Sequence, residues 1–185
     1  ALILGDNLFH VENFSQKIKK ASNQEKGCNI FVYRVSDPNR YGIIELDKEN
    51  KIINIIEKPS KPKNNLAVTG LYFYDDTVTE RVKELSLSAR GELEITDLNK
   101  SYLKQNQLNY QLLSRGSVWL DTGTIDSLHE ASSYIRTIEK RQGLKIGCPE
   151  EIAWRLGWID DNKLEDIASS ITNSGYGNYL LNLLS

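Results

Sequence analysis

The 185-residue sequence predicts an α/β fold with a mixed, mainly parallel sheet, on three observations. Short runs rich in β-branched and aromatic residues, typical of strands, alternate with stretches of helical spacing up to about Thr124. Two such runs end directly in a carboxylate, at Asp6 and at Asp121. The apolar spacing beyond is helical throughout, which predicts a core over residues 1–124 and a helical region over residues 125–185 that packs on the core and at a subunit interface.

The first half of the chain predicts strands with short helices between them. The apolar run Leu2-Ile3-Leu4 predicts a buried parallel strand, and Asn7 is predicted to cap a helix that follows it. The polar tetrad 47–50 between two apolar runs predicts an inserted β-hairpin. The predicted elements of this half are strands at 2–4, 29–35, 42–46, 51–56 and 66–74 and helices at 8–21 and 78–85.

The second half predicts one more α/β segment and then helices. Thr96 is predicted to cap a helix that runs to about Leu103, and strands follow at 108–113 and 118–120. Further helices are predicted at 125–142, from Pro149 to Gly157, after Asp160, and as a last apolar turn at 179–184 beyond two breaking glycines, Gly175 and Gly177.

Composition and charge exclude several function classes. Hydrophobic residues make up 39% and charged residues 26%, as in an ordinary globular protein. The net charge of −2 contains no long run of one sign, which argues against nucleic acid or a membrane surface as partner. No apolar run approaches the roughly 20 residues of a membrane span, and no leader is recognisable, so the cytoplasm is the expected location. Cys28 and Cys148 suggest neither a disulfide nor a zinc site.

The beginning of the chain suggests that it is part of a longer protein. A central strand rarely opens a protein, and the sequence contains no methionine. We therefore expect further residues before Ala1.

Asp6 and Asp121 are candidate metal ligands. Each carboxylate is placed where a strand ends, and Mg²⁺ is usually bound by one or two carboxylates together with phosphates. Both residues fit equally well as helix N-caps, so the pattern leaves the two interpretations open.

Charged residues at strand ends and in loops are candidate sugar and phosphate contacts. Glu57 and Lys58 end an apolar strand, where the glutamate can accept from sugar hydroxyls and the lysine can hold a phosphate. A solvated strand end explains the pair equally simply. Arg90 in a loop could likewise reach a phosphate or form a surface ion pair.

Tyr41-Gly42 and Trp119 are candidates for the walls of a pocket. The glycine allows a close approach to the backbone, although a plain bend at the hairpin is the simpler interpretation. Trp119 lies beside the strand-end carboxylate, but most such aromatic residues belong to the core. His10 and His129 are isolated, and no G-x-S-x-G, G-x-G-x-x-G or P-loop is present, so acyl and hydride transfer have no support.

Seven motifs in order give the sequence a resemblance that covers nearly the whole chain. They are Leu4-Gly5-Asp6-Asn7, Asp37-Pro38-x-Arg40-Tyr41-Gly42, Glu57-Lys58-Pro59, the stretch 67–75, the stretch 89–97, Trp119-Leu120-Asp121-Thr122-Gly123-Thr124 and the stretch 148–153. Together they resemble the bacterial glucose-1-phosphate thymidylyltransferases among the sugar-1-phosphate nucleotidyltransferases. The tail after Ile125 resembles the thymidylyl branch more than the uridylyl branch.

The resemblance implies a Rossmann-like nucleotide-diphospho-sugar transferase fold and a reaction. Mg²⁺ bound by Asp6 and Asp121 would hold the nucleotide phosphates while glucose-1-phosphate attacks dTTP, giving dTDP-glucose and pyrophosphate. This is the first step toward dTDP-L-rhamnose and related surface sugars. The absence of a protein nucleophile agrees with chemistry that depends on positioning and charge neutralisation.

The resemblance also implies roles for residues around the sugar. By the matching motifs, Lys58 and Arg90 would contact the sugar phosphate, with Lys58 counted with the two carboxylates as catalytic. The glucose pocket would be lined by Tyr41, Gly42, Glu57 and Val68, with Tyr72 and Trp119 nearby.

The sequence departs from the family in two places. The glycine-rich loop that cradles the triphosphate is expected upstream of Ala1, so the fragment alone is expected to be inactive. Phe9-His10-Val11 replaces a common glycine near a regulatory nucleotide site, to which Arg115, Lys145 and Arg155 would contribute. Family members are typically tetramers. A uridylyl- or cytidylyltransferase of the same fold and a non-catalytic nucleotide-sugar-binding module are the alternatives.

Overall fold

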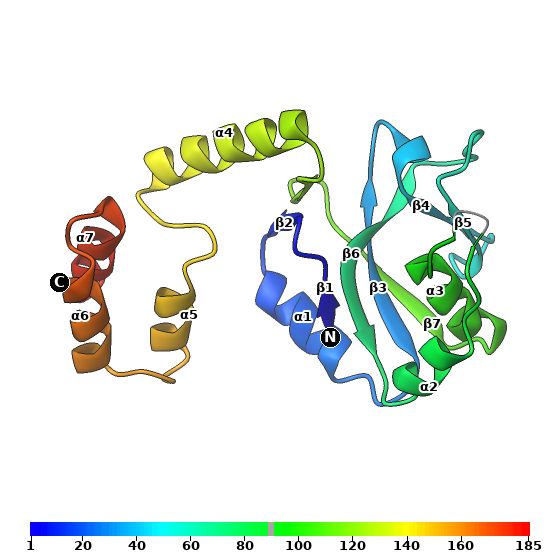
Figure 1. The fold of residues 1–185 in the computed structure, drawn as a ribbon, viewed down its shortest axis with the longest axis horizontal. Helices are drawn as coiled ribbons and strands as arrows, with labels where there is room; N and C mark the ends of the chain where they lie inside the picture. Colours follow the sequence, from blue (N-terminus) through cyan, green and yellow to red (C-terminus); the bar gives the residue numbers. More distant parts are fainter. Residues whose placement is uncertain (89–90) are drawn as a thin grey trace. The chain divides into compact units, whose positions relative to one another are not determined.

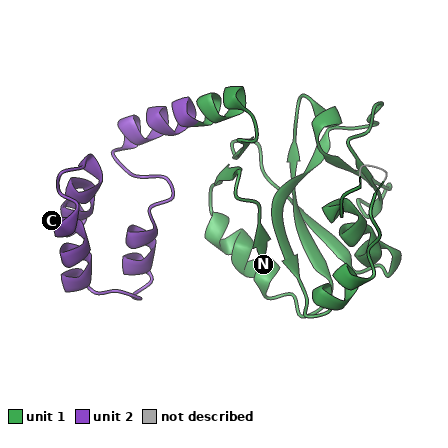
Figure 2. Cartoon of the chain, viewed as in Figure 1, with its two compact units in different colours: residues 1–131 green, residues 132–185 purple. Residues whose placement is uncertain are grey.

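The computed structural model describes residues 1–88 and 91–185, and the chain divides into two compact units (Figure 2). The first unit comprises residues 1–131 and contains all the described strands, whereas the second, residues 132–185, is helical. The division falls within helix α4 (Ile125–Gln142), whose first residue follows the predicted boundary at residue 124. The subunit contacts expected of the helical region remain a prediction.

The first unit contains a six-stranded sheet and a separate two-stranded one (Figure 1). The strands of the larger sheet follow the order β5-β4-β6-β3-β7, with β1 also paired to β6. Their bounds are β1 Leu2–Ile3, β3 Cys28–Arg34, β4 Gly42–Leu46, β5 Ile52–Glu57, β6 Leu66–Tyr74 and β7 Leu108–Leu112. The smaller sheet pairs β2 (Asn7–His10) with β8 (Val118–Asp121).

The predicted α/β class and mixed sheet are confirmed, but the expectation of mainly parallel strands is wrong for the described pairings. β3 and β7 run parallel, whereas the pairs β1/β6, β3/β6, β4/β5, β4/β6 and β2/β8 are antiparallel. A continuous apolar run indicates that both faces of a strand are covered, but it does not indicate the direction of the neighbouring strands.

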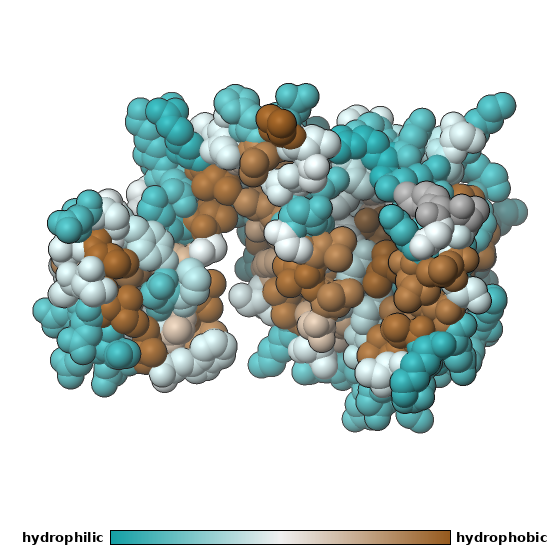
Figure 3. Space-filling model, in the orientation of Figure 1, coloured by the Kyte–Doolittle hydropathy of each residue, from teal (hydrophilic) through white to brown (hydrophobic). Residues whose placement is uncertain are grey.

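The predicted buried parallel strand at the start of the chain is also corrected. β1 runs antiparallel to β6, and Leu2, Ile3 and Leu4 are 41%, 57% and 39% exposed. Figure 3 shows hydrophobic side chains at the surface of the first unit in the region of β1 and α1. Among the described residues, β1 pairs with β6 alone.

Helices cover the two faces of the larger sheet. Ile30 and Val32 of β3 pack in one cluster with Leu98 and Tyr102, and the intervening Phe31 packs in a second cluster with Ala21. Alternate residues of one strand therefore contact α3 on one face and α1 on the other. The remaining helices are α1 Phe14–Ser22, α2 Val78–Lys83, α3 Ile95–Lys104, α5 Pro149–Arg155, α6 Asp161–Ser170 and α7 Gly175–Asn182, with a 3₁₀ turn at Pro38–Arg40.

The helix predicted over residues 8–21 is wrong in its first part. Residues 7–10 form β2, and Leu8 and His10 lie opposite Leu120 and Val118 of β8. The helix begins only at Phe14, after Asn13 has adopted a left-handed conformation at φ 54°. Apolar spacing alone favoured the helix because the pairing strand lies far away in the sequence.

Two further predictions about helix ends are corrected. Glu94, and not Thr96, is the N-cap of α3, since the Thr96 hydroxyl donates to Glu57 instead. The helix after Asp160, α6, already ends at Ser170, so Gly175 and Gly177 do not end it and instead lie inside α7. A Cβ at Gly177 would lie 2.5 Å from the carbonyl oxygen of Ile171, so glycine permits the close packing of α7 against the end of α6.

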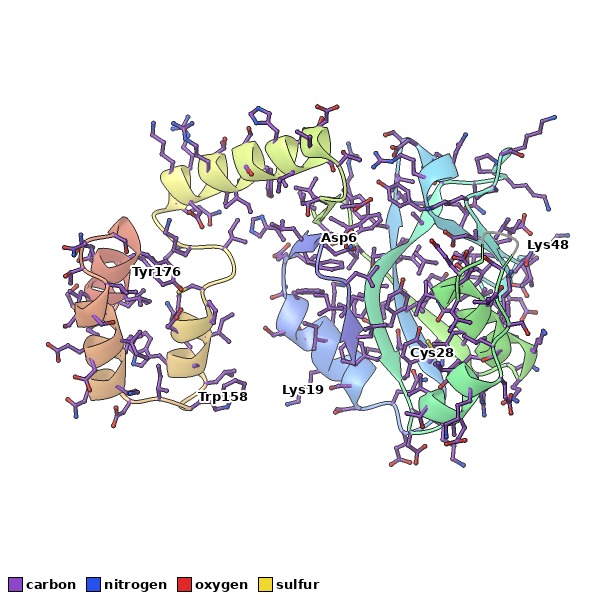
Figure 4. The ribbon with its side chains drawn as sticks, in the orientation of Figure 1. Asp6, Lys19, Cys28, Lys48, Trp158 and Tyr176 are labelled. Carbon is purple, nitrogen blue, oxygen red and sulfur yellow. The ribbon has the colours of Figure 1, made fainter. Side chains whose placement is uncertain are left out.

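The second unit has its own small core. Cys148, Leu164, Ala168 and Leu180 are its buried residues. The hydroxyls of Tyr176 and Tyr179 donate to the carboxylates of Glu150 and Glu151, which ties α7 to the first turn of α5; Figure 4 labels Tyr176 on α7. Cys148 and Cys28 are both free and buried.

Among the described residues, none of the helices combines the length and apolar character needed to cross a bilayer.

Tyr102 makes the stability of the first unit sensitive to pH in the alkaline range. Its buried hydroxyl donates to Asp75 over 2.9 Å, and Arg81 stacks on its ring at 3.9 Å. Burial and the hydrogen bond to the Asp75 carboxylate raise the pKa of Tyr102 to about 12, whereas a tyrosine in an unfolded chain has a pKa of about 10. The stabilisation is therefore complete below about pH 10 and is lost as pH rises toward 12.

Urea denaturation between pH 8 and pH 12, followed by circular dichroism, checks this dependence. The unaltered chain should lose stability above pH 10 more steeply than Tyr102→Phe, since phenylalanine cannot ionise. Other buried tyrosines contribute equally to both proteins, so the difference between the two curves isolates Tyr102. Parallel curves would contradict the assignment.

Candidate active site

A cavity of about 160 Å³ in the first unit collects most of the predicted site residues. Cavities of about 440 and 590 Å³ contain none of the residues predicted to contact substrate, whereas one of about 460 Å³ shares Arg40, Tyr41, Trp119 and Asp121 with the small cavity. The lining residues of the small cavity are Leu4, Asp6, Asn7, Arg40, Tyr41, Gly42, Glu57, Val68, Thr69, Gly70, Tyr72, Ile95, Thr96, Trp119 and Asp121. They come from β2, β4, β5, β6, β8, α3, the 3₁₀ turn at Pro38–Arg40 and the loops beside these elements.

The pairing of β2 with β8 brings Asp6 and Asp121 to one place. Asn7 lies opposite Asp121, so Asp6, at the turn before β2 (Figure 4), is next to the end of β8. A Cβ at Gly123 would lie 3.1 Å from Asp121 Oδ1 and 3.4 Å from Asp6 Oδ2. Both carboxylates therefore flank the same point, and a larger residue than glycine would intrude between them.

Neither aspartate is a helix cap. Asp6 precedes a strand, and Thr124 caps α4 by accepting from the backbone N–H of Ser127 at 3.2 Å. The loop after β8 instead holds the two aspartates together. Thr122 donates to the Asp6 carbonyl through its backbone N–H and its hydroxyl, each at 2.8 Å, and the Gly123 N–H donates to Asp121 Oδ1 at 3.1 Å.

The donor set of this pair suits a hard divalent cation. Mg²⁺ is commonly bound by one or two carboxylates, with water and phosphate oxygens completing the shell. Across residues 1–88 and 91–185, no cluster of three or more His, Cys, Asp or Glu side chains suitable for a metal is found, so a cation at Asp6 and Asp121 needs ligands from a substrate or solvent. Arg40 is the neighbouring cation, with Nη2 at 3.7 Å from Asp121 Oδ2.

Glu57 lies within the cavity and is held by a short hydrogen bond. The Thr96 hydroxyl donates to Glu57 Oε2 at 2.5 Å. Gly42 lies opposite Glu57 in the β4/β5 pair, and a Cβ there would lie 3.2 Å from both Glu57 Oε2 and Thr96 Oγ1. Gly42 therefore allows the Glu57 and Thr96 side chains to approach the backbone closely. This favours the predicted close approach over a plain bend.

Aromatic residues form one wall of the cavity. The rings of Tyr41 and Trp119 lie 5.0 Å apart, and those of Tyr33 and Trp119 lie 6.0 Å apart. Burial raises the pKa of Tyr41, and burial together with the Glu57 carboxylate raises the pKa of Tyr72. Both tyrosines are therefore protonated at neutral pH and can donate hydrogen bonds.

Other predicted residues lie apart from the cavity lining. Lys58 is exposed and has a left-handed backbone at φ 42°, and Arg90 lies outside the described residues. Of the predicted regulatory residues, Arg115 is exposed in the first unit. In the second unit, Lys145 pairs with Glu139 at 2.6 Å and Arg155 pairs with Glu151 at 2.7 Å. The regulatory site stays a prediction.

Seven residues of the cavity lining were not predicted as site residues, among them Asn7, Arg40, Gly70 and Thr96. Asn7 and Thr96 were assigned to helix caps, because short polar residues next to helical spacing are typical of caps. Gly70 lies in the predicted strand 66–74 and received no role of its own. Its position inside β6 was the available signal, since a glycine within a strand marks a close approach of another group.

The matching family model is described as Nucleotidyl transferase, and it covers residues 1–138. Among curated proteins, a Neisseria meningitidis glucose-1-phosphate thymidylyltransferase is 50% identical over 99% of this chain and 64% of its own length. One from Xanthomonas campestris is 51% identical over 97% of this chain and 61% of its own length. The chain thus spans less than two thirds of these relatives.

Solved structures of nucleotidyltransferases also match the chain. A Bacillus anthracis protein described as a glucose-1-phosphate thymidylyltransferase, in complex with a sucrose, matches with a TM-score of 0.63 and 44% identity over 71% of this chain and 52% of that one. A UDP-glucose pyrophosphorylase complexed with UDP-glucose matches with a TM-score of 0.63 over 73% of this chain and 55% of its own, and at 21% identity it supports the fold alone. The predicted resemblance and nucleotide-sugar transferase fold are confirmed, and the chain belongs to the nucleotidyl transferase family.

Proposed function

We propose that the protein to which this chain belongs transfers a thymidylyl group from dTTP to glucose-1-phosphate, forming dTDP-glucose and pyrophosphate. One observation carries the proposal: two carboxylates flank a single point beside a cavity that also contains a glutamate and aromatic residues. The first arrangement suits a Mg²⁺–phosphate complex and the second suits a sugar. The names of relatives at about 50% identity supply the thymidylyl and glucose assignments.

The sugar would lie in the cavity with its hydroxyls toward polar groups. Glu57 accepts from sugar hydroxyls, and the hydrogen bond from Thr96 fixes its carboxylate before the sugar binds. Tyr41 and Trp119 present ring surface on one side, and Val68 and Gly42 lie on the cavity lining. Lys58 and Arg90 are the proposed cations for the sugar phosphate.

Catalysis would rest on positioning and charge neutralisation. An oxygen of the sugar phosphate attacks the α-phosphorus of dTTP in line, so that one P–O bond forms while the bond to pyrophosphate breaks. Mg²⁺ held by Asp6 and Asp121 would supply neutralisation of the phosphate charge. The chain itself keeps the two carboxylates together through Thr122 and Gly123.

The proposed reaction also needs residues from the part of the relatives' length that this chain does not span. A glycine-rich loop there would bind the triphosphate, so the 185 residues alone should be inactive. The same proposal includes a cytoplasmic tetramer that supplies dTDP-glucose for dTDP-L-rhamnose and related surface sugars.

Pyrophosphate release by the intact gene product tests the reaction. Release with dTTP, glucose-1-phosphate and Mg²⁺ is expected, with much less from UTP, CTP or ATP. A preference for UTP or CTP would indicate the uridylyl or cytidylyl alternative. Binding of glucose-1-phosphate and dTDP-glucose by this chain, without any turnover by the intact protein, would indicate a nucleotide-sugar-binding module.

Arg40 is expected to weaken cation binding in the absence of substrate. Its guanidinium lies 3.1 Å from Asp37 and 3.7 Å from Asp121, so it partly neutralises a proposed ligand. Arg40→Gln should tighten Mn²⁺ binding to the chain by a factor of about two to five, because an exposed ion pair contributes up to roughly 1 kcal/mol. Isothermal titration with Arg34→Gln as the control measures this, since Arg34 contacts the Asn65 amide and no described carboxylate. Weaker binding in Arg40→Gln would contradict the expectation.

A further inference from the structure

A single side chain, that of Asn7, connects the carboxylate pair with the wall of the cavity. Its Oδ1 accepts from the backbone N–H of Gly70 at 2.9 Å and from the indole Nε1–H of Trp119 at 2.6 Å. Its Nδ2 donates to Asp6 Oδ1 at 2.9 Å. Three strands, β2, β6 and β8, therefore meet at one amide.

These contacts require an amide at this position. The indole and the backbone N–H both need an acceptor, whereas the Asp6 carboxylate needs a donor, and an amide side chain offers both. The local backbone is shaped to receive it. A Cβ at Gly70 would lie 2.6 Å from Asn7 Oδ1 and 2.8 Å from Nδ2, so the absence of a side chain at Gly70 makes room for the asparagine.

The direction of the Asp6 carboxylate follows from this arrangement. Asn7 binds Oδ1 of Asp6, and Oδ2 is the oxygen that points toward Gly123, beside Asp121. The same amide sets the tilt of the Trp119 indole, which packs against Tyr41 in the cavity. A change at Asn7 must therefore reach both halves of the site.

We propose that Asn7 is a positioning residue that couples the cation ligand Asp6 to the sugar-pocket wall Trp119. The proposal rests on the proposed function, because it takes Asp6 as a cation ligand and the cavity as the sugar pocket. Residues that orient metal ligands typically contribute about tenfold to a hundredfold to metal affinity. Because Asn7 also holds Trp119, the affinity for the sugar should fall with the same change.

Binding measurements on the 185-residue chain separate the effect of Asn7 on cation binding from its effect on sugar binding. Mn²⁺ affinity is measured by electron paramagnetic resonance and glucose-1-phosphate affinity by isothermal titration. Asn7→Ala should weaken Mn²⁺ binding about tenfold and glucose-1-phosphate binding about fivefold. Trp119→Phe should weaken only the binding of glucose-1-phosphate, since the Asn7 amide keeps its hydrogen bond to Asp6. Asn54→Ala is the matched control, as Asn54 is also a strand asparagine that donates to a carboxylate, Glu45 at 3.2 Å, outside the cavity.

An indole resonance gives a readout that needs no ligand. The chain has three tryptophans, and only the Trp119 indole should shift and exchange faster in ¹H–¹⁵N spectra of Asn7→Ala. Gly70→Ala provides a second variant that displaces the amide without removing it, and it should reproduce the indole change and the Mn²⁺ loss. Far-UV circular dichroism verifies that each variant is folded.

The outcomes are distinct from those for the proposed function. If Asn7→Ala and Gly70→Ala are folded and leave Mn²⁺ affinity or the Trp119 resonance unchanged, the coupling is overturned. If the unaltered chain binds neither ligand, the proposed function is contradicted for this chain. The indole resonance then decides alone: a shift in both variants supports the position of Asn7, and an unchanged resonance overturns it.

Discussion

Replacing Asp121 by asparagine is expected to lower Mg²⁺-dependent pyrophosphate release by the intact protein more than about a hundredfold while leaving the fold intact. Even residues that only orient metal ligands cost about tenfold to a hundredfold, and Asp121 is a proposed direct ligand. Asparagine keeps the shape and can still accept from the Gly123 N–H, now 3.1 Å from Asp121 Oδ1. The loss should therefore come from the missing charge beside Asp6.

The control for this variant is Asp126→Asn, in the exposed first turn of α4. It removes a nearby carboxylate from the same loop-helix segment but not from the pair, and its activity should match that of the unaltered protein. Circular dichroism and the Mn²⁺ affinity of the 185-residue chain are measured in parallel. An Asp121→Asn variant that unfolds, with activity per folded molecule unchanged, would show that Asp121 is structural.

Glu57→Gln is expected to raise the KM for glucose-1-phosphate by about tenfold to a hundredfold. A hydrogen bond from a hydroxyl to a carboxylate contributes about 1.5 to 3 kcal/mol, roughly twice as much as one to an amide, so two such bonds weakened together account for this range. The Thr96 hydroxyl can donate to the amide oxygen or accept from the amide nitrogen, so the contact with Thr96 is kept while the charge is lost. The affinity of the chain for glucose-1-phosphate, measured by isothermal titration, should fall with the same ratio.

Glu45→Gln is the matched control for Glu57→Gln. Glu45 lies on β4, is 8% exposed, and pairs with Lys63 at 2.9 Å and Asn54 at 3.2 Å away from the cavity. Its replacement should reduce stability without changing sugar phosphate affinity. If Glu57→Gln behaves in the same way, Glu57 supports the fold and does not contact the sugar.

Local patterns in the sequence were enough for most strands and helices. The strand at 66–74, the hairpin at 42–57 and the Asp160 cap match the structure, because apolar runs, polar turns and short capping side chains act on neighbouring residues. Partners distant in sequence were beyond such patterns. β2 was assigned to a helix because nothing near residue 8 indicates a pairing with residue 120.

The candidate site shows the same division. Asp6, Glu57, Trp119 and Asp121 were selected by their positions at strand ends, and all four line the cavity. Asn7 and Thr96 were missed because their hydrogen-bond partners are distant in sequence. The partners of Asn7 are the Gly70 N–H, 63 residues away, and the Trp119 indole, 112 residues away, and the partner of Thr96 is 39 residues away. Such contacts arise only once the strands are paired.

The most direct test is a ¹H–¹⁵N spectrum of the tryptophan indoles during titration with glucose-1-phosphate. Trp119 lines the cavity, whereas Trp154 donates to Asp161 and Trp158 is 75% exposed, both in the second unit. If the cavity binds the sugar phosphate, the Trp119 resonance shifts in a saturable way and the other two stay in place. No shift at Trp119, or saturable shifts confined to Trp154 and Trp158, would contradict the assignment of this cavity as the sugar-phosphate site.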